Sequence, residues 1–318
     1  MNQVRMLTAE QFPLIPPLFR QVFGGDISLA MLQWKYGAGR GAAYGYFGDN
    51  GELLVHCGLS YRRALADGQL RRIAHMGDLM AVPGGRGGLG RSAPFALVIQ
   101  RMLDDLATPQ NPDALAFGFP SDRAMRLGER LGLFSAIDQM QLLTFAPLPR
   151  SWRADRVIPC PRPDDTFRPL VDRLWQGMAE ALGDDLIVVR DAPYLDDRYF
   201  GHPTLRYTCS LVRPWWGGRP LGVIVTRREG EQVELVDMVA PPALMGRLIQ
   251  AARQHLADWG AQTLTLWLTE HHGTTFADEA LRNDRMELRI MANPFSSGGN
   301  PQRFAGRWWL TSGDTDYH

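Results

Sequence analysis

The stretch that decides the fold is DLMAVPGGRGGLGRS, residues 78–92. A strand-like apolar pattern over Arg71–Val82 ends there in five glycines within Gly84–Gly90, and helical periodicity follows from Ser92 to Leu106. Main-chain amides left uncovered by glycine at the start of a helix attract anions, most often phosphate. The pattern predicts a strand, an anion-binding glycine loop and a helix, although a flexible turn has the same composition.

The chain ahead of this stretch predicts two helices and then a meander of antiparallel strands. Apolar residues at helical spacing begin at Phe12 and end at Gly24-Gly25, and a second helix is expected over Leu29–Tyr36. Turn signals such as Ala66-Asp67-Gly68 separate the strand-like runs that follow. The expected strands are Ala43–Phe47, Leu53–Tyr61 and Arg71–Val82.

After the glycine loop the chain alternates strands and helices, and its second half repeats the element order of the first. Six prolines between Ala146 and Pro169 interrupt any period. We therefore expect a domain over residues 1–146, a proline-rich linker over 147–164 and a second domain with a C-terminal tail over 165–318. The remaining expected elements are strands Ala114–Phe119, Gln139–Phe145, Tyr207–Val212, Leu221–Thr226, Val233–Val239, Thr263–Leu268 and Glu287–Met291, and helices Asp122–Gly132, Leu170–Ala181, Leu244–Trp259 and Thr275–Arg282.

A meander followed by Asp78-Leu79-Met80-Ala81-Val82-Pro83 and by Arg86-Gly87-Gly88-Leu89-Gly90 resembles the GNAT superfamily of acyl-CoA-dependent N-acyltransferases. Trp34-Lys35-Tyr36-Gly37 is similar to a segment before the sheet in a bacterial branch of that superfamily. The resemblance covers residues 1–146 and extends more weakly over 165–292. It implies an α/β (α+β) protein of tandem GNAT folds, each a mostly antiparallel mixed sheet flanked by helices, with an active first copy and a degenerate second.

The sequence departs from the superfamily pattern in two places. The pattern Q/R-x-x-G-x-G/A has its Arg or Gln place at Gly85 when Gly88 and Gly90 take the two small positions, so that Arg86 stands one residue late. Many members carry a Tyr in the helix after the next strand as the acid for the leaving thiolate, and here Gly128 stands at that place. The source of that proton is therefore left open.

Acyl transfer to an amine needs a group that takes the proton of the amine. GNAT members often place this base on the strand ahead of the loop, which implies Asp78 or His75. Alternation puts Asp78 on the face of Met80 and Val82 and His75 on the other, unless a bulge shifts the parity. A carboxylate that caps amides and a satisfied core histidine are the ordinary alternatives.

Other candidate residues surround this strand and loop or lie near the termini. Trp34, Tyr36, Tyr44 and Tyr46 are candidates to line an acceptor pocket, or they belong to the core. His271-His272 is not expected to hold a metal, because adjacent residues do not share a face. The tail Gly313–His318 looks like tails of the same GNAT branch, so a tail carboxylate is a further candidate, although termini often fray. The residues expected to bind acyl-CoA are Met80, Ala81, Val82, Arg86, Gly87, Gly88, Leu89, Gly90, Arg91 and Ser92.

The composition disfavours several classes of partner. Basic and acidic residues number 34 each among 318, so no global positive field attracts nucleic acid or an anionic membrane. Cys57, Cys160 and Cys209 form no C-x-x-C motif, which favours a reducing cytoplasm. The first residues lack the apolar core of a signal peptide, and no apolar run approaches the ~18 residues of a membrane span. We expect a cytoplasmic protein that binds neither nucleic acid nor membrane.

The expected function is transfer of an acyl group from acetyl-CoA or another acyl-CoA to the amine of a small molecule. A degenerate GNAT fold that binds a ligand or partner without catalysis is an alternative, which the altered loop and the missing Tyr favour. Release of free CoA thiol in the presence of amines distinguishes the two. An aminoacyl or peptidyl transferase would need a charged groove for tRNA, which the neutral composition disfavours.

Overall fold

The computed structural model describes residues 3–82, 90–109, 111, 113–295 and 300–315. They form two compact units, each assembled from separate stretches of the chain. Unit 1 comprises Met1–Arg63, Arg72–Ile137 and Leu288–Ala305, and unit 2 comprises Ala64–Arg71, Asp138–Glu287 and Gly306–His318.

The sheet of unit 1 has the strand order β1-β2-β3-β4-β5-β13. Its strands are β1 (Val4–Met6), β2 (Gly41–Phe47), β3 (Leu53–Ala66), β4 (Gln69–Ala81), β5 (Ala116–Gly118) and β13 (Arg282–Ala292). β3 and β4 are joined at Asp67 and Gly68, whose φ angles of 51° and 69° suit a tight hairpin turn. β5 runs parallel to β4 after a helical crossover and antiparallel to β13, so the expected meander is confirmed and is extended into a mixed sheet.

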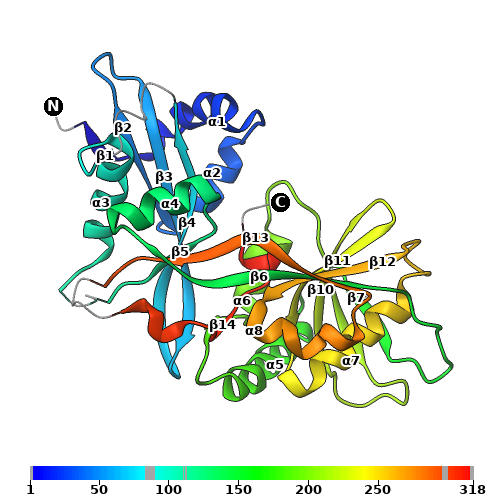
Figure 1. The fold of residues 1–318 in the computed structure, drawn as a ribbon. Helices are drawn as coiled ribbons and strands as arrows, with labels where there is room; N and C mark the ends of the chain where they lie inside the picture. Colours follow the sequence, from blue (N-terminus) through cyan, green and yellow to red (C-terminus); the bar gives the residue numbers. More distant parts are fainter. Residues whose placement is uncertain (1–2, 83–89, 110, 112, 296–299, 316–318) are drawn as a thin grey trace. The chain divides into compact units, whose positions relative to one another are not determined.

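Helices cover both faces of this sheet (Figure 1). The helices are α1 (Ile15–Phe23), α2 (Leu29–Tyr36), α3 (Pro94–Leu106) and α4 (Asp122–Leu131). On one face, Leu32 of α2 shares an apolar core with Met80 of β4. On the other face, Ile99 of α3 and Met125 of α4 pack in a second core with Val55. Strand β4 therefore contributes side chains to two separate cores.

Local sequence signals set several helix boundaries. Ser28 accepts a hydrogen bond from the backbone N–H of Met31 at the start of α2. Gly24 ends α1 and Gly132 ends α4, with φ angles of 76° and 69° that glycine adopts without strain.

Unit 2 has parallel and antiparallel strand pairs, in the order β6-β12-β11-β10-β9-β7. Its strands are β6 (Ser135–Phe145), β7 (Arg156–Cys160), β9 (Thr208–Arg213), β10 (Gly222–Glu229), β11 (Gln232–Val239) and β12 (Thr263–Thr269), with the shorter β8 (Leu186–Val188) and β14 (Trp308–Trp309). The helices are α5 (Phe167–Ala181), α6 (Ala192–Leu195), α7 (Pro242–His255) and α8 (Glu270–Gly273). β12 runs parallel to β11 after the α7 crossover, as β5 runs parallel to β4 after α3. The repeated element order is thus a repeated arrangement.

The structure corrects several expected elements. The helix expected over Thr275–Arg282 is a 3-10 helix over Thr274–Glu279, and Arg282 already begins β13. The proline-rich stretch contains strand β7, which pairs with β9 at the edge of the sheet. Pro159 is tolerated in this edge strand, because its missing N–H costs little there. The short strands β1, β8 and β14 have too few residues to show a period.

The two units do not coincide with residues 1–146 and 165–318. The last residues of β6 pair with β12 in unit 2, and Met291 and Ala292 of β13 pair with β5 in unit 1. Asn293 also serves unit 1, because its Oδ1 accepts the N–H of Ala116 at 2.7 Å. The domain boundaries at residues 146 and 165 stay a prediction, and the pairing of β13 with β5 argues against them.

We expect a fragment of residues 1–146 to lack a cooperative fold, because β5 would lose its β13 partner and Asn293. Chemical denaturation followed by circular dichroism and hydrogen exchange at Ala116–Gly118 measures this. A sigmoidal unfolding transition with protected β5 amides in the fragment would contradict the assignment of β13 to unit 1.

Candidate functional site

Strand β4 changes the direction of its side chains at Asp78. The core under α3 and α4 contains Ala74 and Met76, which precede Asp78. The same core also contacts Leu79 and Ala81, which follow it. An uninterrupted strand would not place residues of even and odd number on one face. Asp78 has a φ of 50°, a left-handed conformation that is uncommon for aspartate. Asp78 is therefore the extra residue of a β-bulge.

The bulge decides which of the predicted residues share a face. Met80 and Val82 lie in the core on the α1 and α2 side, together with Tyr36. The side chain of Asp78 reaches the same side, since it hydrogen-bonds to Tyr36. The side chains of Asp78, Met80 and Val82 therefore share one side, as alternation predicts, and the bulge separates them from Ala74 and Met76 on the other side.

β4 and β5 separate directly before the bulge. Their parallel register runs from Ala74 and Ala116 to Met76 and Gly118 and ends there. The strands approach closely at that point, because a Cβ on Gly118 would lie 2.6 Å from the carbonyl oxygen of Met76. Beyond it, β4 keeps its bonds to β3, as in the 3.0 Å bond from the N–H of Val82 to Leu54. Within the part of the chain that is described, no strand pairs with the other edge of β4 after Met76.

Two residues of α2 hold the side chain of Asp78. Its Oδ2 accepts hydrogen bonds from the Lys35 ammonium at 2.7 Å and from the Tyr36 hydroxyl at 2.5 Å. The Lys35 and Asp78 side chains are only 4% and 9% exposed, and Lys35 is the single lysine of the chain. Gly58 makes room for the cluster, because a Cβ there would lie 2.1 Å from the Tyr36 hydroxyl. We call Lys35, Tyr36 and Asp78 the carboxylate cluster.

His56 of β3 supports the backbone at the bulge, although it is not among the site residues predicted from the sequence. Its Nδ1 lies 2.8 Å from the carbonyl oxygen of Asp78, which can only accept, so Nδ1 carries a proton. Complete burial lowers the pKa of His56 and favours the neutral ring, although the nearby Asp78 opposes this. Alternation along β3 between the buried Val55 and Cys57 is the signal that predicts an inward His56 on the opposite face.

The other predicted catalytic and aromatic residues lie in different surroundings. His75 is buried, with its ring centroid 5.2 Å from that of Phe117. Tyr44 faces the core under α3, where burial and then Asp105 raise the pKa of its hydroxyl. Tyr46 donates a hydrogen bond to Gln3 at 2.8 Å and lines a shallow cavity of about 430 Å³ beside α3. Of the predicted aromatic residues, the structure brings Tyr36 to Asp78, and Trp34 lies on the same helix.

The predicted glycine loop lies mostly outside the described residues, which include neither Arg86 and Gly87 nor Gly88 and Leu89. The loop ends with Gly90, Arg91 and Ser92, which are exposed directly before α3. The 13-residue helix α3 begins after them, so its positive dipole end lies where the loop ends.

The position expected for a general-acid Tyr is closed by packing. A Cβ on Gly128 would lie 2.1 Å from the ring of Phe134, which is buried. A larger residue at 128 would displace that ring from the core, so the glycine has a structural cause.

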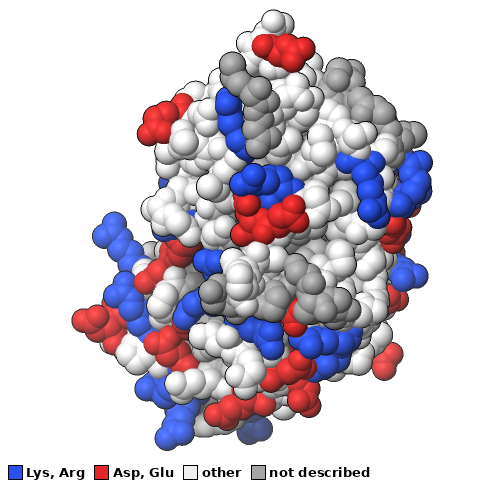
Figure 2. Space-filling view, turned by 90° about the vertical axis from the view of Figure 1, so that its left-hand side faces the viewer, with Lys and Arg blue, Asp and Glu red and all other residues white. Residues whose placement is uncertain are grey.

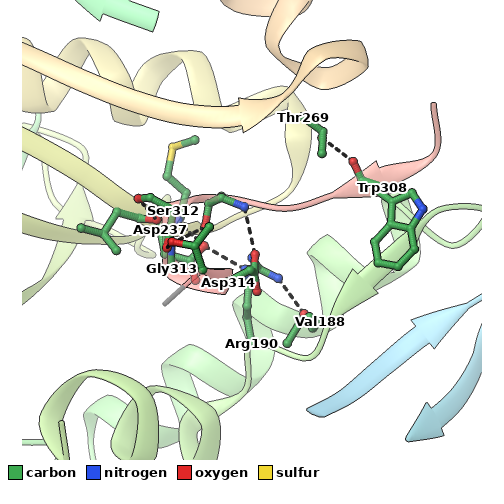
Figure 3. A network of polar contacts seen from close by, with 12 residues as sticks. Val188, Arg190, Asp237, Thr269, Trp308, Ser312, Gly313 and Asp314 are labelled. Atoms are coloured by element: carbon green, nitrogen blue, oxygen red, sulfur yellow. Dashed lines mark hydrogen bonds and ion pairs between the residues drawn. The ribbon is translucent and has the colours of Figure 1, made fainter. Parts of the chain in front are cut away.

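In unit 2 the corresponding strands also separate, but the chain fills the gap. The pairing of β11 with β12 ends at Leu235 and Leu266, and the C-terminal segment follows β12 from there. Thr311 forms a bridge with Leu268, and the Ser312 hydroxyl donates to the carbonyl oxygen of Val236 at 3.4 Å. We call residues 310–315 the tail plug, and part of it is shown in Figure 3.

A buried network of charges fixes the tail plug (Figure 3). Arg190 binds Asp237 of β11 at 2.8 Å and Asp314 of the plug at 2.5 Å, and all three side chains are almost completely buried. Burial raises the pKa of Asp237, and Arg190 counteracts this. Asp237 also accepts a hydrogen bond from Tyr199 at 2.7 Å. The carboxylate before α7 is therefore fully used in structural contacts.

Other features of the sequence have structural roles in unit 2. Prolines 241 and 242 stand at the start of α7, where unit 1 has its glycine loop. His272 lies in the short helix α8, and burial followed by His271 lowers its pKa to about 4. Among the described residues no group of His, Cys, Asp and Glu is arranged to hold a metal ion. None of the described helices has the length and hydropathy of a membrane span.

We expect Lys35→Met to lower the free energy of unfolding by about 3 kcal/mol, because it leaves the Asp78 carboxylate buried without its cation. Urea denaturation of the variant measures the loss. Arg20→Met is the matched control, since Arg20 and Asp26 form an ion pair whose side chains are 66% and 73% exposed. The control should change by less than about 0.5 kcal/mol. Equal effects of the two substitutions would contradict a buried carboxylate cluster.

Comparisons with known proteins establish the fold. No protein-family model matches the sequence, and no curated protein is significantly similar to it. A probable N-acyltransferase of Enterococcus faecalis V583 has 14% identity and a TM-score of 0.68, covering 91% of this chain and 71% of that chain. A GCN5-related N-acetyltransferase from Kribbella flavida has 16% identity and a TM-score of 0.63, covering 91% and 70%.

The Saccharomyces cerevisiae N-myristoyltransferase, solved with bound myristoyl-CoA, has 9% identity and a TM-score of 0.59, covering 100% of this chain and 87% of that chain. The chain thus has the fold of GCN5-related N-acetyltransferases and of N-myristoyltransferase, repeated in two units. The fold that the GNAT resemblance implied is confirmed.

Proposed function

We propose that this chain is an acyl-CoA-dependent N-acyltransferase whose reaction takes place at β4 of unit 1. The observation that carries the proposal is the separation of β4 from β5 at the Asp78 bulge. Beyond Met76 no described strand pairs with β4 on the β5 side, and this is where we place an extended ligand beside the strand. The solved structures with this fold include N-acetyltransferases and an N-myristoyltransferase with bound myristoyl-CoA, which supports acyl-CoA as the ligand.

In this proposal the pantetheine arm lies beside Met80, Ala81 and Val82. The phosphates bind the amides of the glycine loop, Arg86–Gly90, and of Arg91 and Ser92 at the positive end of α3. The thioester of the bound acyl-CoA then lies toward the bulge, because the pantetheine arm runs along β4 from the glycine loop toward Asp78.

Asp78 is the proposed proton acceptor, directly or through one water molecule. Lys35 and Tyr36 both bind its Oδ2, so they fix the carboxylate and leave Oδ1 for the amine or the water. The amine nitrogen attacks the thioester carbon, the C–S bond breaks, and the proton of the amine passes to Asp78. The departing thiolate takes a proton from water, since Gly128 supplies none.

The proposal extends to the residues that contact the acceptor and to the acyl length of the donor. Trp34 and Tyr36 are the proposed acceptor contacts, since Tyr36 hydrogen-bonds to Asp78 and Trp34 lies on the same helix. Tyr44 is the weaker candidate, because it faces the opposite core. Acetyl-CoA is the first acyl donor to test and longer acyl-CoAs are the second, since solved structures with this fold include acetyltransferases and a myristoyltransferase. His75 remains a candidate base only if the Asp78 variant retains activity.

The competing proposal is a degenerate fold that binds a ligand without catalysis. Gly128 at the place of the acid and the ion-paired state of Asp78 favour it. It predicts CoA binding with no release of free thiol from acyl-CoA by any amine.

We expect Asp78→Asn to bind CoA with nearly unchanged affinity and to reduce turnover on the best amine by at least ~100-fold. Calorimetry measures the affinity, and the release of CoA thiol measures turnover. His75→Gln is the matched control and should retain turnover. A Gly88→Leu substitution should instead weaken CoA binding, because the loop amides would be covered.

Retained turnover in Asp78→Asn with a loss in His75→Gln, or in a chain without 316–318, would assign the base to another residue. Absence of acylation with CoA binding intact would favour the ligand-binding protein.

A further inference from the structure

Three tryptophans of unit 2 lie together at its surface, on two loops next to β7. The side chains of Trp152 and Trp216 are 76% and 62% exposed. The ring of Trp215 lies between them, with centroid distances of 5.3 Å to Trp152 and 5.7 Å to Trp216. Large exposed aromatic groups of this kind mark surfaces that meet a partner. We call Trp152, Trp215 and Trp216 the tryptophan patch.

The tryptophan patch is surrounded by arginines. The Arg153 guanidinium lies 4.4 Å from the ring centroid of Trp152, and the Arg247 guanidinium lies 5.2 Å from that of Trp216. Residues 150–156 and 213–219 together contain five arginines and one acidic residue, Asp155. Asp155 is bound to Arg247 at 2.5 Å, and Arg150 forms an ion pair with Asp258, which lies outside these two segments. The patch is therefore locally cationic, although the chain as a whole is neutral.

The turn that carries Trp215 and Trp216 projects into solvent in a fixed shape. It joins β9 to β10, and Gly217 and Gly218 adopt φ angles of 89° and 93°. A Cβ on either glycine would meet nothing within 4 Å. The guanidinium of Arg213 donates to the carbonyl oxygen of Gly218 at 3.0 Å and closes the turn. The turn holds the indole rings in position before binding, so little conformational entropy is lost when they bind.

We propose that the tryptophan patch docks unit 2 onto an anionic lipid surface. Indole rings are stable at the level of lipid headgroups, where one side is apolar and the other is hydrated. Arginines bind phosphate oxygens in pairs and attract the negative surface of the bilayer. A projecting turn suits a lipid surface, which needs no complementary shape, better than it suits a protein partner, which does. The equal numbers of basic and acidic residues exclude a positive electrostatic field over the whole protein. The arginines around the tryptophan patch still create a local positive field.

Flotation with lipid vesicles tests the proposal on the full chain. We expect the protein to float with vesicles of equal parts phosphatidylcholine and phosphatidylglycerol, and not with phosphatidylcholine alone. Trp152→Ala with Trp216→Ala should reduce the bound fraction at least about tenfold. Arg153→Gln with Arg219→Gln should reduce it more at low salt than at high salt, because at high salt screening already weakens the contribution of these two charges.

Matched controls separate the patch from general effects. Leu281→Ala removes an exposed apolar side chain of unit 2, 66% exposed, outside the patch. Arg282→Gln with Arg285→Gln removes the same charge from side chains that are 68% and 67% exposed. Both controls should bind vesicles as the original chain does, and circular dichroism checks that each variant is folded.

Two results would overturn the proposal. One is no flotation with anionic vesicles, or flotation that the folded tryptophan variant retains. The other is a self-associated chain, detected by sedimentation, that the tryptophan variant dissociates while no vesicle binds. That result would make the patch an interface between copies of the protein.

Discussion

The bulge at Asp78 is the constraint from which the candidate site follows. It reverses the side-chain parity of β4, so that one strand fills the core under α3 and α4 and also sends a carboxylate to α2. A left-handed aspartate is unfavourable by itself. Lys35, Tyr36 and His56 hold it from both sides, by the carboxylate and by the carbonyl oxygen. The separation of β4 from β5 begins at the same place.

The two units use the same strand separation in different ways. In unit 2 the tail plug fills it, and Arg190 with Asp237 and Asp314 fixes the plug in a buried network. In unit 1 no such plug lies among the described residues. The repeated fold thus has one position closed by its own chain, and the other is the position at which we propose that the ligand binds. Prolines 241 and 242 act in the same direction, because they remove amides from the start of α7.

The fold and part of the site could be predicted from local patterns. The meander, the α3 crossover and the repeated order follow from periodicity and turn residues, and Asp78 follows from its place before the glycine loop. The pairing of β6 with β12 and of β13 with β5 could not be predicted. Strand partners that lie far apart in the sequence leave no local signal. Lys35 appeared only as part of a motif, and its burial beside Asp78 depends on the bulge. His56 and the tail plug were missed, since each acquires its role through tertiary contacts.

The most direct test of this account is a crystal structure of the full chain grown with a stable acyl-CoA analogue. The account predicts one CoA per chain, with its phosphates at the start of α3 and its acyl carbonyl next to β4 at Asp78. The tail plug should remain between β11 and β12. Density for CoA along β11, two molecules per chain, or a chain saturated with analogue that binds it away from β4 would contradict the account.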